Sequence, residues 1–349
     1  MFQKTPITTI IPTYRRPKML RRAVCSVLSQ TYPHFQVCVY DNASGDETAS
    51  VVAELAKLDS RVKYHCHSEN IGALKNFIYG MEHVETPFFS FLPDDDVLLP
   101  EFYETAMEGF NNFPDAIFSA GSIIQMTDKG KIIAVYLSSW KRDGYYTPPD
   151  GLFEMLEKYG PGFTAAVFRK DIIKKVGVFD LSVGAPADLD YLIRTMAHFP
   201  FVISRKPCAI WTTHSSSFTV QLGFSSDVWL GWLKLIRNLS EDKTISLNVR
   251  IHATSKLTGR IKKMLFWSGI IYIKNNDFEK AYKTIKIFRD YYKSKNETFI
   301  LCTLANFRKH FPPGYFFLVS ANKYYNKIKY KKDYRLQEQF GQYARFLEF

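Results

Sequence analysis

The sequence has few cysteines, and they form no recognisable motif. The five cysteines are odd in number, scattered and without a C-x-x-C spacing: Cys25, Cys38, Cys66, Cys208 and Cys302. A disulfide-stabilised secreted domain or a cysteine-rich zinc site requires paired or regularly spaced cysteines. We therefore expect reduced cysteines in the core of a cytoplasmic protein.

Long apolar runs are missing as well. No apolar stretch approaches the roughly 18 residues that a transmembrane helix needs, and the first residues lack the pattern of a signal peptide. The sequence thus predicts a cytoplasmic protein that contacts a membrane, if at all, peripherally on its inner face.

Acidic residues are scarce in the last third of the chain. Residues 1–220 carry 22 Lys and Arg against 24 Asp and Glu, whereas residues 221–349 carry 24 against 10. A basic region beside a nearly neutral one predicts an anionic partner for the basic region. The candidates are a membrane surface, a phospholipid-linked acceptor and nucleic acid.

Strands and helices alternate through the first part of the chain. Segments of helical periodicity separate four strand-like segments: Thr8–Pro12, Gln36–Asp41, Arg61–His67 and Pro87–Leu92. This rhythm predicts an α/β fold with a mostly parallel central sheet and helices on both faces. Beyond Gln221 the chain becomes rich in Lys and Tyr with helical periodicity. We predict an α/β domain over residues 1–220 and a helical C-terminal region over residues 221–349.

Polar segments follow the predicted strands, where an open parallel sheet binds its ligands. These segments are Pro12–Arg16, Asp41–Asp46, Asn70–Asn76 and Asp94–Asp96. They supply a carboxylate (Asp41), a backbone-exposing glycine (Gly72), the cations Arg15, Arg16 and Lys75, and an acidic cluster. Such groups suit a base, a ribose and a diphosphate with its metal.

Asp94, Asp95 and Asp96 form the strongest single signal. Three adjacent carboxylates repel one another and are costly after an apolar strand unless a cation lies nearby. Oxygen ligands favour Mg2+ or Mn2+, which bind one or two carboxylates and leave other positions to phosphate and water. The alternative is a solvated acidic turn before the helix that follows Pro100.

Four motifs in order resemble the family 2 glycosyltransferases with the GT-A fold. They are Ile10–Arg15 (IIPTYR), Tyr40–Thr48 (YDNASGDET), Asn70–Gly72 (NIG) and Phe91–Pro100 (FLPDDDVLLP). The resemblance implies a nucleotide-sugar donor, with uracil as the base. The nucleotide-binding residues that it implies, together with the cation Lys75, are Pro12, Thr13, Tyr14, Arg15, Asp41, Asn70, Gly72 and Asp94.

The same resemblance implies a DxD metal site. Asp95 would bind the metal directly, with Asp94 toward the ribose. Many family members carry an aspartate where this chain has Pro93, so that Asp95 and Asp96 are the alternative ligand pair. His214 matches a histidine that completes the metal or diphosphate site in some members; a structural role is the alternative.

The resemblance also implies a catalytic base at a helix start after a G-x-F-D element. Here Gly177–Asp180 (GVFD) precedes Asp188, which fits the position, and Asp190 is the second choice. The glutamate that usually precedes the base is Ala187 in this chain. Alternatively, both aspartates only favour the helix N-terminus electrostatically.

The reaction implied is an inverting, metal-dependent transfer of a hexose or N-acetylhexosamine to a glycan or lipid-linked acceptor, as in cell-surface polysaccharide synthesis. The chain lacks the Q-x-x-R-W element and membrane spans of processive members, so we expect a non-processive enzyme. The alternatives are a catalytically inactive glycan-binding relative and a basic nucleic-acid-binding protein. No recognised nucleic-acid-binding motif supports the latter, so we expect no nucleic-acid partner.

The basic C-terminal region suits the headgroup level of an anionic membrane or a lipid-diphosphate acceptor. Its cations and interleaved tyrosines are Lys323, Tyr324, Tyr325, Lys327, Lys329, Tyr330, Lys331, Lys332, Tyr334 and Arg335. The alternative is a solvated helical face that packs in a homo-oligomer.

Overall fold

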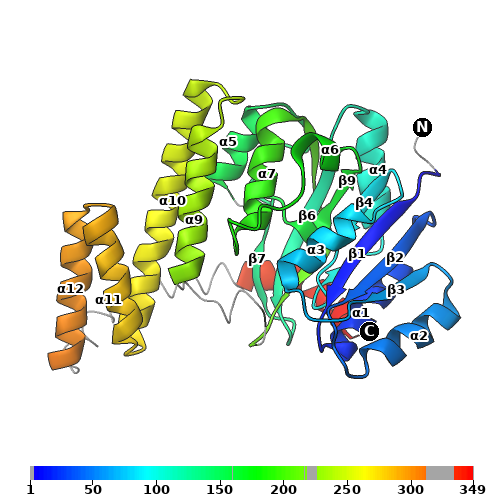
Figure 1. The fold of residues 1–349 in the computed structure, drawn as a ribbon, viewed down its shortest axis with the longest axis horizontal. Coiled ribbons are helices and arrows are strands. Elements are labelled where there is room, and N and C mark those ends of the chain that lie inside the picture. Colours follow the sequence, from blue (N-terminus) through cyan, green and yellow to red (C-terminus); the bar gives the residue numbers. More distant parts are fainter. Residues whose placement is uncertain (1–3, 159, 216, 218–225, 312–333, 349) are drawn as a thin grey trace.

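The computed structural model describes residues 4–158, 160–215, 217, 226–311 and 334–348. An α/β part built on one large sheet lies beside a group of helices, α9 to α12, that extends away from it (Figure 1).

The first half of the sheet is parallel. Its order is β3-β2-β1-β4, with bounds β1 Ile7–Thr13, β2 Phe35–Asp41, β3 Val62–Cys66 and β4 Phe88–Phe91. The connecting helices are α1 Pro17–Leu28, α2 Thr48–Leu58 and α3 Ala73–Glu82. All seven residues of β1 are buried, which explains its near-continuous apolar and β-branched sequence. Pro17 opens α1, where its missing N–H leaves no intrahelical bond unmade.

The second half of the sheet is mixed. It continues β9-β6-β10-β5, with β7 beside β6 and β8 beside β10. The bounds are β5 Val97–Leu98, β6 Phe118–Thr127, β7 Ile132–Val135, β8 Gly144–Tyr146, β9 Ala166–Arg169 and β10 Phe201–Thr213. The remaining helices of this part are α4 Phe102–Asn112, α5 Asp150–Glu157, η1 Phe163–Ala165, α6 Ile172–Val176 and α7 Ala187–His198. The predicted α/β fold class is confirmed.

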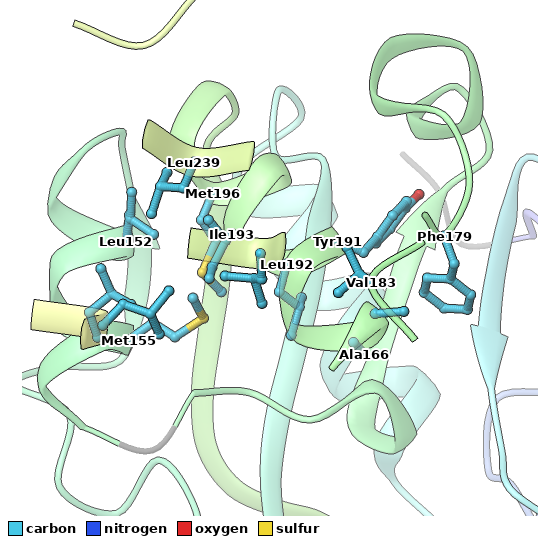
Figure 2. Packing of buried hydrophobic residues seen from close by; sticks show 14 of the residues in the cluster. Leu152, Met155, Ala166, Phe179, Val183, Tyr191, Leu192, Ile193, Met196 and Leu239 are labelled. Atoms are coloured by element: carbon cyan, nitrogen blue, oxygen red, sulfur yellow. The ribbon is translucent and has the colours of Figure 1, made fainter. Parts of the chain in front are cut away.

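Helix α7 packs between the α/β part and the C-terminal helices. Its buried face inserts Leu192, Ile193 and Met196 between α5 and α9 (Figure 2). At the start of the same helix, Tyr191 packs edge-on against Phe179. The first turn of α7, where the catalytic base is predicted, is therefore anchored by a dense apolar core.

The C-terminal region is helical, as predicted. Its elements are α9 Ser226–Glu241, α10 Leu247–Lys274, α11 Phe278–Lys286, the π-helical turn Ile287–Tyr291, α12 Lys295–His310, a helix over residues 334–340 and the 3-10 segment Gly341–Leu347. Every fourth residue of α10 from Ala253 to Ile273 is buried against its neighbours. Among the described residues no helix is both long and apolar enough to cross a bilayer. The predicted boundary at residue 220 falls outside the described residues.

Candidate active site

The carboxyl ends of β1, β2 and β4 bring the predicted binding segments together. Thr13 and Asp41 are register partners at the ends of β1 and β2. The acidic turn Asp94–Asp96 follows β4, and the Thr13 hydroxyl donates to Asp94 Oδ2 at 2.8 Å. Because these strands are parallel, their polar ends share one edge of the sheet, as the sequence predicted.

Asp41 is buried at the centre of the second nucleotide loop. Its Oδ1 accepts the backbone N–H of Ser44 at 3.0 Å, and its Oδ2 accepts the hydroxyl of Tyr64 at 2.6 Å. Arg15 donates its backbone N–H to Ser44 Oγ at 2.8 Å, which ties the first loop to the second. Arg15 and Ala43 both adopt positive φ, 54° and 60°, so the two loops are tightly turned. Tyr64 was not predicted from the sequence.

The third loop is held by an asparagine pair. The Asn42 amide donates to Asn70 Oδ1 at 2.9 Å, and Asn42 Oδ1 accepts the N–H of Ile71 at 2.8 Å. Gly72, with φ 88°, turns the chain into α3 in a conformation that a side chain would strain. Lys75 is exposed on the first turn of α3.

The remaining nucleotide-binding candidates lie on the first loop. Pro12 is buried in β1, whereas Tyr14 is 38% exposed at its end. The guanidinium of Arg15 lies 5.0 Å from the centre of the Tyr14 ring. The loop therefore presents a cation and an aromatic face beside the buried Asp41.

Asp94 has partners on two sides. Arg16 Nη1 donates to Asp94 Oδ1 at 3.1 Å, in addition to the contact from Thr13. Burial, together with the charge of Asp95, raises the pKa of Asp94 to about 6, while Arg16 and Thr13 act in the opposite direction. This carboxyl group is thus strongly desolvated.

Asp95 and His214 form the candidate metal-binding pair. His214 Nε2 and Asp95 Oδ2 lie 3.0 Å apart, although they are 119 positions apart in the chain. Arg16 Nη1 also donates to Asp95 Oδ2 at 3.1 Å and so bridges Asp94 and Asp95. Both members of the pair are buried, at 9% and 8% exposure.

Asp96 points into the protein. Its Oδ1 accepts the backbone N–H of Thr212 at 2.9 Å, and its Oδ2 accepts the hydroxyl of Thr164 at 2.8 Å. Burial and the charge of Asp95 raise the pKa of Asp96 well above its ordinary value. Each of its oxygens therefore already has a protein donor, which favours Asp95 over Asp96 as the metal-facing carboxylate.

Arg22 binds the backbone of the acidic turn. The sequence did not predict this role. Its guanidinium donates to the backbone carbonyl of Asp95 and, at 3.4 Å, to Thr212 Oγ1. Burial lowers the pKa of Arg22, while the charges of Asp96 and Asp95 act in the opposite direction. One side chain from α1 thus connects the turn to the end of β10.

The donor set fits a divalent ion that relies on its substrate for further ligands. Among the described residues no group of three or more His, Cys, Asp or Glu side chains has metal-binding geometry. Asp95 and His214 offer one carboxylate and one imidazole. Mg2+ and Mn2+ commonly accept one or two protein ligands and complete their coordination with phosphate and water. The residues present are therefore compatible with such an ion.

The two candidate bases have different surroundings. Asp188 is exposed in the first turn of α7, and its Oδ1 accepts the N–H of Leu189 at 2.7 Å. Although the residue is exposed, nearby protein still desolvates its carboxyl group, which raises the pKa of Asp188. Asp190 is buried and accepts Arg194 Nε at 2.8 Å. This ion pair occupies Asp190 and leaves Asp188 the better candidate. No hydrogen bond links Asp188 to the acidic turn in the part of the chain that the structure describes.

The predicted membrane-facing cations lie mostly beyond the described residues. Residues 323–332 are not described, so only Tyr334 and Arg335 of that group have a position in the structure. Both are exposed.

The part of the chain that carries the four motifs resembles known proteins. The model of glycosyl transferase family 2 matches residues 8–177, which contain all four motifs. These residues form a family 2 glycosyltransferase domain. Asp188 and His214 lie beyond the matched range.

Curated relatives of the family 2 domain include several glycosyltransferases. A GalNAc(5)-diNAcBac-PP-undecaprenol beta-1,3-glucosyltransferase of Campylobacter jejuni is 34% identical over 106 residues, which are 30% of this chain and 34% of that protein. An uncharacterized glycosyltransferase of Rickettsia typhi is 23% identical over 79% of this chain and 82% of its own length. The chain thus spans about a third of the length of the Campylobacter relative.

Solved structures share the fold at low sequence identity. TarS 1-349 of S. aureus superimposes with a TM-score of 0.60 at 15% identity, over 87% of this chain and 91% of that one. The same protein in complex with UDP-GlcNAc gives 0.59 at 14% identity, over 81% and 91%. Mannosyltransferase PcManGT from Pyrobaculum calidifontis, in complex with GDP-Man and Mn2+, gives 0.53 at 15% identity, over 99% and 86%.

Proposed function

We propose that this protein transfers a sugar from a uridine diphosphate sugar to a hydroxyl group of a glycan or lipid-linked acceptor, with inversion at the anomeric carbon. The observation that carries the proposal is the convergence of Asp41, Asp94 and Asp95 at the carboxyl ends of parallel strands. The family 2 domain and the UDP-GlcNAc complex of the structural neighbour TarS support it.

Different residues of the chain would bind the base, the ribose and the divalent ion. Asp41, fixed by Ser44 and Tyr64, would accept a hydrogen bond from the base, and Asp94 would face the ribose. Asp95 and His214 would hold the divalent ion. When bound, Mn2+ or Mg2+ supplies Lewis-acid stabilisation of the negative charge that develops on the leaving diphosphate.

Asp188 would act as the base. Its carboxylate would take the proton of the acceptor hydroxyl as that oxygen attacks the anomeric carbon. Its exposed position on a rigidly packed helix suits a group that meets an incoming acceptor. Asp190 would instead hold Arg194 and so fix the first turn of α7.

A screen of nucleotide sugars tests the donor. We expect UDP-sugars with Mn2+ to raise the melting temperature of the purified protein, and GDP-sugars to have a smaller effect. Asp95→Ala should abolish the Mn2+-dependent part of the shift and sugar transfer, and Asp188→Asn should abolish transfer while the shift remains. Glu108→Gln, an exposed substitution on α4, is the matched control. Near-normal turnover in Asp188→Asn would remove that residue from the base role.

Peripheral membrane association is the second part of the proposal. The net charge of residues 221–349 favours an anionic surface, and the Campylobacter relative is named for an acceptor carried on undecaprenol diphosphate. Sedimentation with vesicles that contain anionic lipid should carry the protein down, whereas neutral vesicles should not. Absence of binding to both would exclude this part.

A further inference from the structure

The last described segment of the chain returns to the α/β domain. Residues 334–348, here called the C-terminal segment, lie beside β7 and far from α12 (Figure 1). They cover a separate buried cluster of six apolar side chains, here called the edge cluster: Val97, Leu99, Ile124, Met126, Ile132 and Ile210. Among the described residues, seven partly buried side chains pack on this cluster, and six of them belong to the segment: Leu336, Phe340, Tyr343, Ala344, Phe346 and Leu347.

Polar contacts fix the position of the C-terminal segment. Gln337 Oε1 accepts the N–H of Ile132 at 3.1 Å, and Gln337 Nε2 donates to the carbonyl of Gly130 at 3.3 Å. A side chain at Gly130 would come within 2.8 Å of the Ala344 methyl group, so the two backbones approach closely. One glutamine amide thus pairs with both a donor and an acceptor of the β6–β7 hairpin, which sets the orientation as well as the contact.

The edge cluster includes residues that adjoin the candidate metal site in the chain. Val97 directly follows Asp96 in sequence and is the register partner of Ile210 in the β5–β10 pair. Two residues beyond Ile210, the N–H of Thr212 donates to Asp96, and His214 directly follows Thr213, the last residue of β10. A shift of Val97 or Ile210 would therefore move Asp95 and His214 relative to each other.

We propose that the C-terminal segment is an intramolecular buttress that holds the acidic turn and the end of β10 in the geometry needed for metal and donor binding. The inference rests on the proposed function for the role of Asp95 and His214. Its structural half, the support of β5 and β10 by the segment, stands independently. Side chains such as Phe340 and Gln337 act as positioning residues, because they touch the cluster and not the site.

Hydrogen exchange and metal affinity test this inference on the full-length protein. In Phe340→Ala we expect faster amide exchange at residues 97–99 and 208–212, measured without metal. The Kd for Mn2+, titrated calorimetrically with UDP present, should rise about 3- to 10-fold, which lies within the range that packing changes between coupled sites produce. Phe340→Leu should recover most of both effects, because it restores apolar cover.

Two further variants keep the test decisive. Gln337→Ala removes only the polar contacts. It should also speed amide exchange at residues 97–99 and 208–212 and raise the Kd for Mn2+, so it provides the test if Phe340→Ala fails to fold. Gln342→Ala changes an exposed side chain of the same segment and should leave both readouts at wild-type values. Faster exchange confined to residues 334–348 would overturn the inference, as would an equal effect of Gln342→Ala. If wild type itself binds no Mn2+, the proposed function fails, and the exchange measurement still decides the structural half.

Discussion

The role of Asp96 provides the sharpest test of how the acidic turn is built. Its two oxygens accept the Thr212 N–H at 2.9 Å and the Thr164 hydroxyl at 2.8 Å. In Asp96→Asn the remaining carbonyl oxygen can accept from Thr212, and the new NH2 group can donate to Thr164 Oγ1. The substitution also removes a carboxyl group whose ionisation burial disfavours. We therefore expect the free energy of unfolding to change by less than about 1 kcal/mol.

Asp96→Ala should behave differently. It leaves the Thr212 N–H buried without its acceptor and removes the tie between the acidic turn and β10. An unsatisfied buried donor, with the loss of hydrogen bonds to a carboxylate, costs about 2–4 kcal/mol. Urea denaturation at neutral pH, with the midpoint and slope fitted together, measures this difference between the two variants.

Metal affinity separates Asp96 from Asp95. We expect Asp95→Asn to weaken Mn2+ binding by more than about 100-fold, beyond the 10- to 100-fold that loss of an outer partner causes. Asp96→Asn should weaken it by less than about 10-fold, because Asp96 acts through the position of the turn. Calorimetric titration of Mn2+ in the presence of UDP supplies both values. Loss of binding in Asp96→Asn as complete as in Asp95→Asn, at wild-type stability, would refute this reasoning.

Substitutions at two further positions and one pH profile test the rest of the site. Tyr64→Phe removes the hydroxyl that orients Asp41, so the Kd for UDP, measured by calorimetry, should rise about 3- to 10-fold. An unchanged Kd would show that the contact between Tyr64 and Asp41 does not contribute to binding of the base. Desolvation raises the pKa of Asp188, and the base must be ionised, so the rate should fall on the acid side at a higher pH than for an ordinary carboxyl group. A pH profile of kcat/KM measures this, and an acid limb at the ordinary carboxyl pKa would contradict it. Arg22→Met removes the contacts to the Asp95 carbonyl and Thr212, so the free energy of unfolding should fall by about 1–3 kcal/mol. Arg22→Lys should recover part of this loss. An unfolding free energy of Arg22→Met equal to that of wild type in urea denaturation would show that Arg22 does not stabilise the acidic turn.

The meeting of the loops could be predicted because it follows from local patterns. Apolar, β-branched runs marked β1, β2 and β4, and parallel strands place their carboxyl ends at one edge. The pairing of Thr13 with Asp41 follows once that register is set. The short elements β5, β8, α5 and α6 were not predicted, because two to eight residues carry too little periodicity to identify an element.

The direction in which each aspartate points was beyond sequence reasoning. Asp96 turns inward because of Thr164 and Thr212, which lie 68 and 116 positions further along the chain. Arg22 reaches the Asp95 carbonyl across 73 positions. A single sequence has no signal for such pairings, since each depends on how α1, η1 and β10 pack around the turn.

Three identical neighbours thus acquire three roles from their partners. Asp94 is held by Thr13 and Arg16, and Asp96 by protein donors on both oxygens. The described side-chain contacts of Asp95 are to the Arg16 guanidinium and the His214 ring. A bound ligand could take either group as its own partner. A divalent ion at Asp95 would compete with Arg16 for the same carboxylate, and a donor diphosphate would offer Arg16 a new anion. Metal and nucleotide should therefore favour each other's binding, because each relieves the electrostatic cost that the other creates.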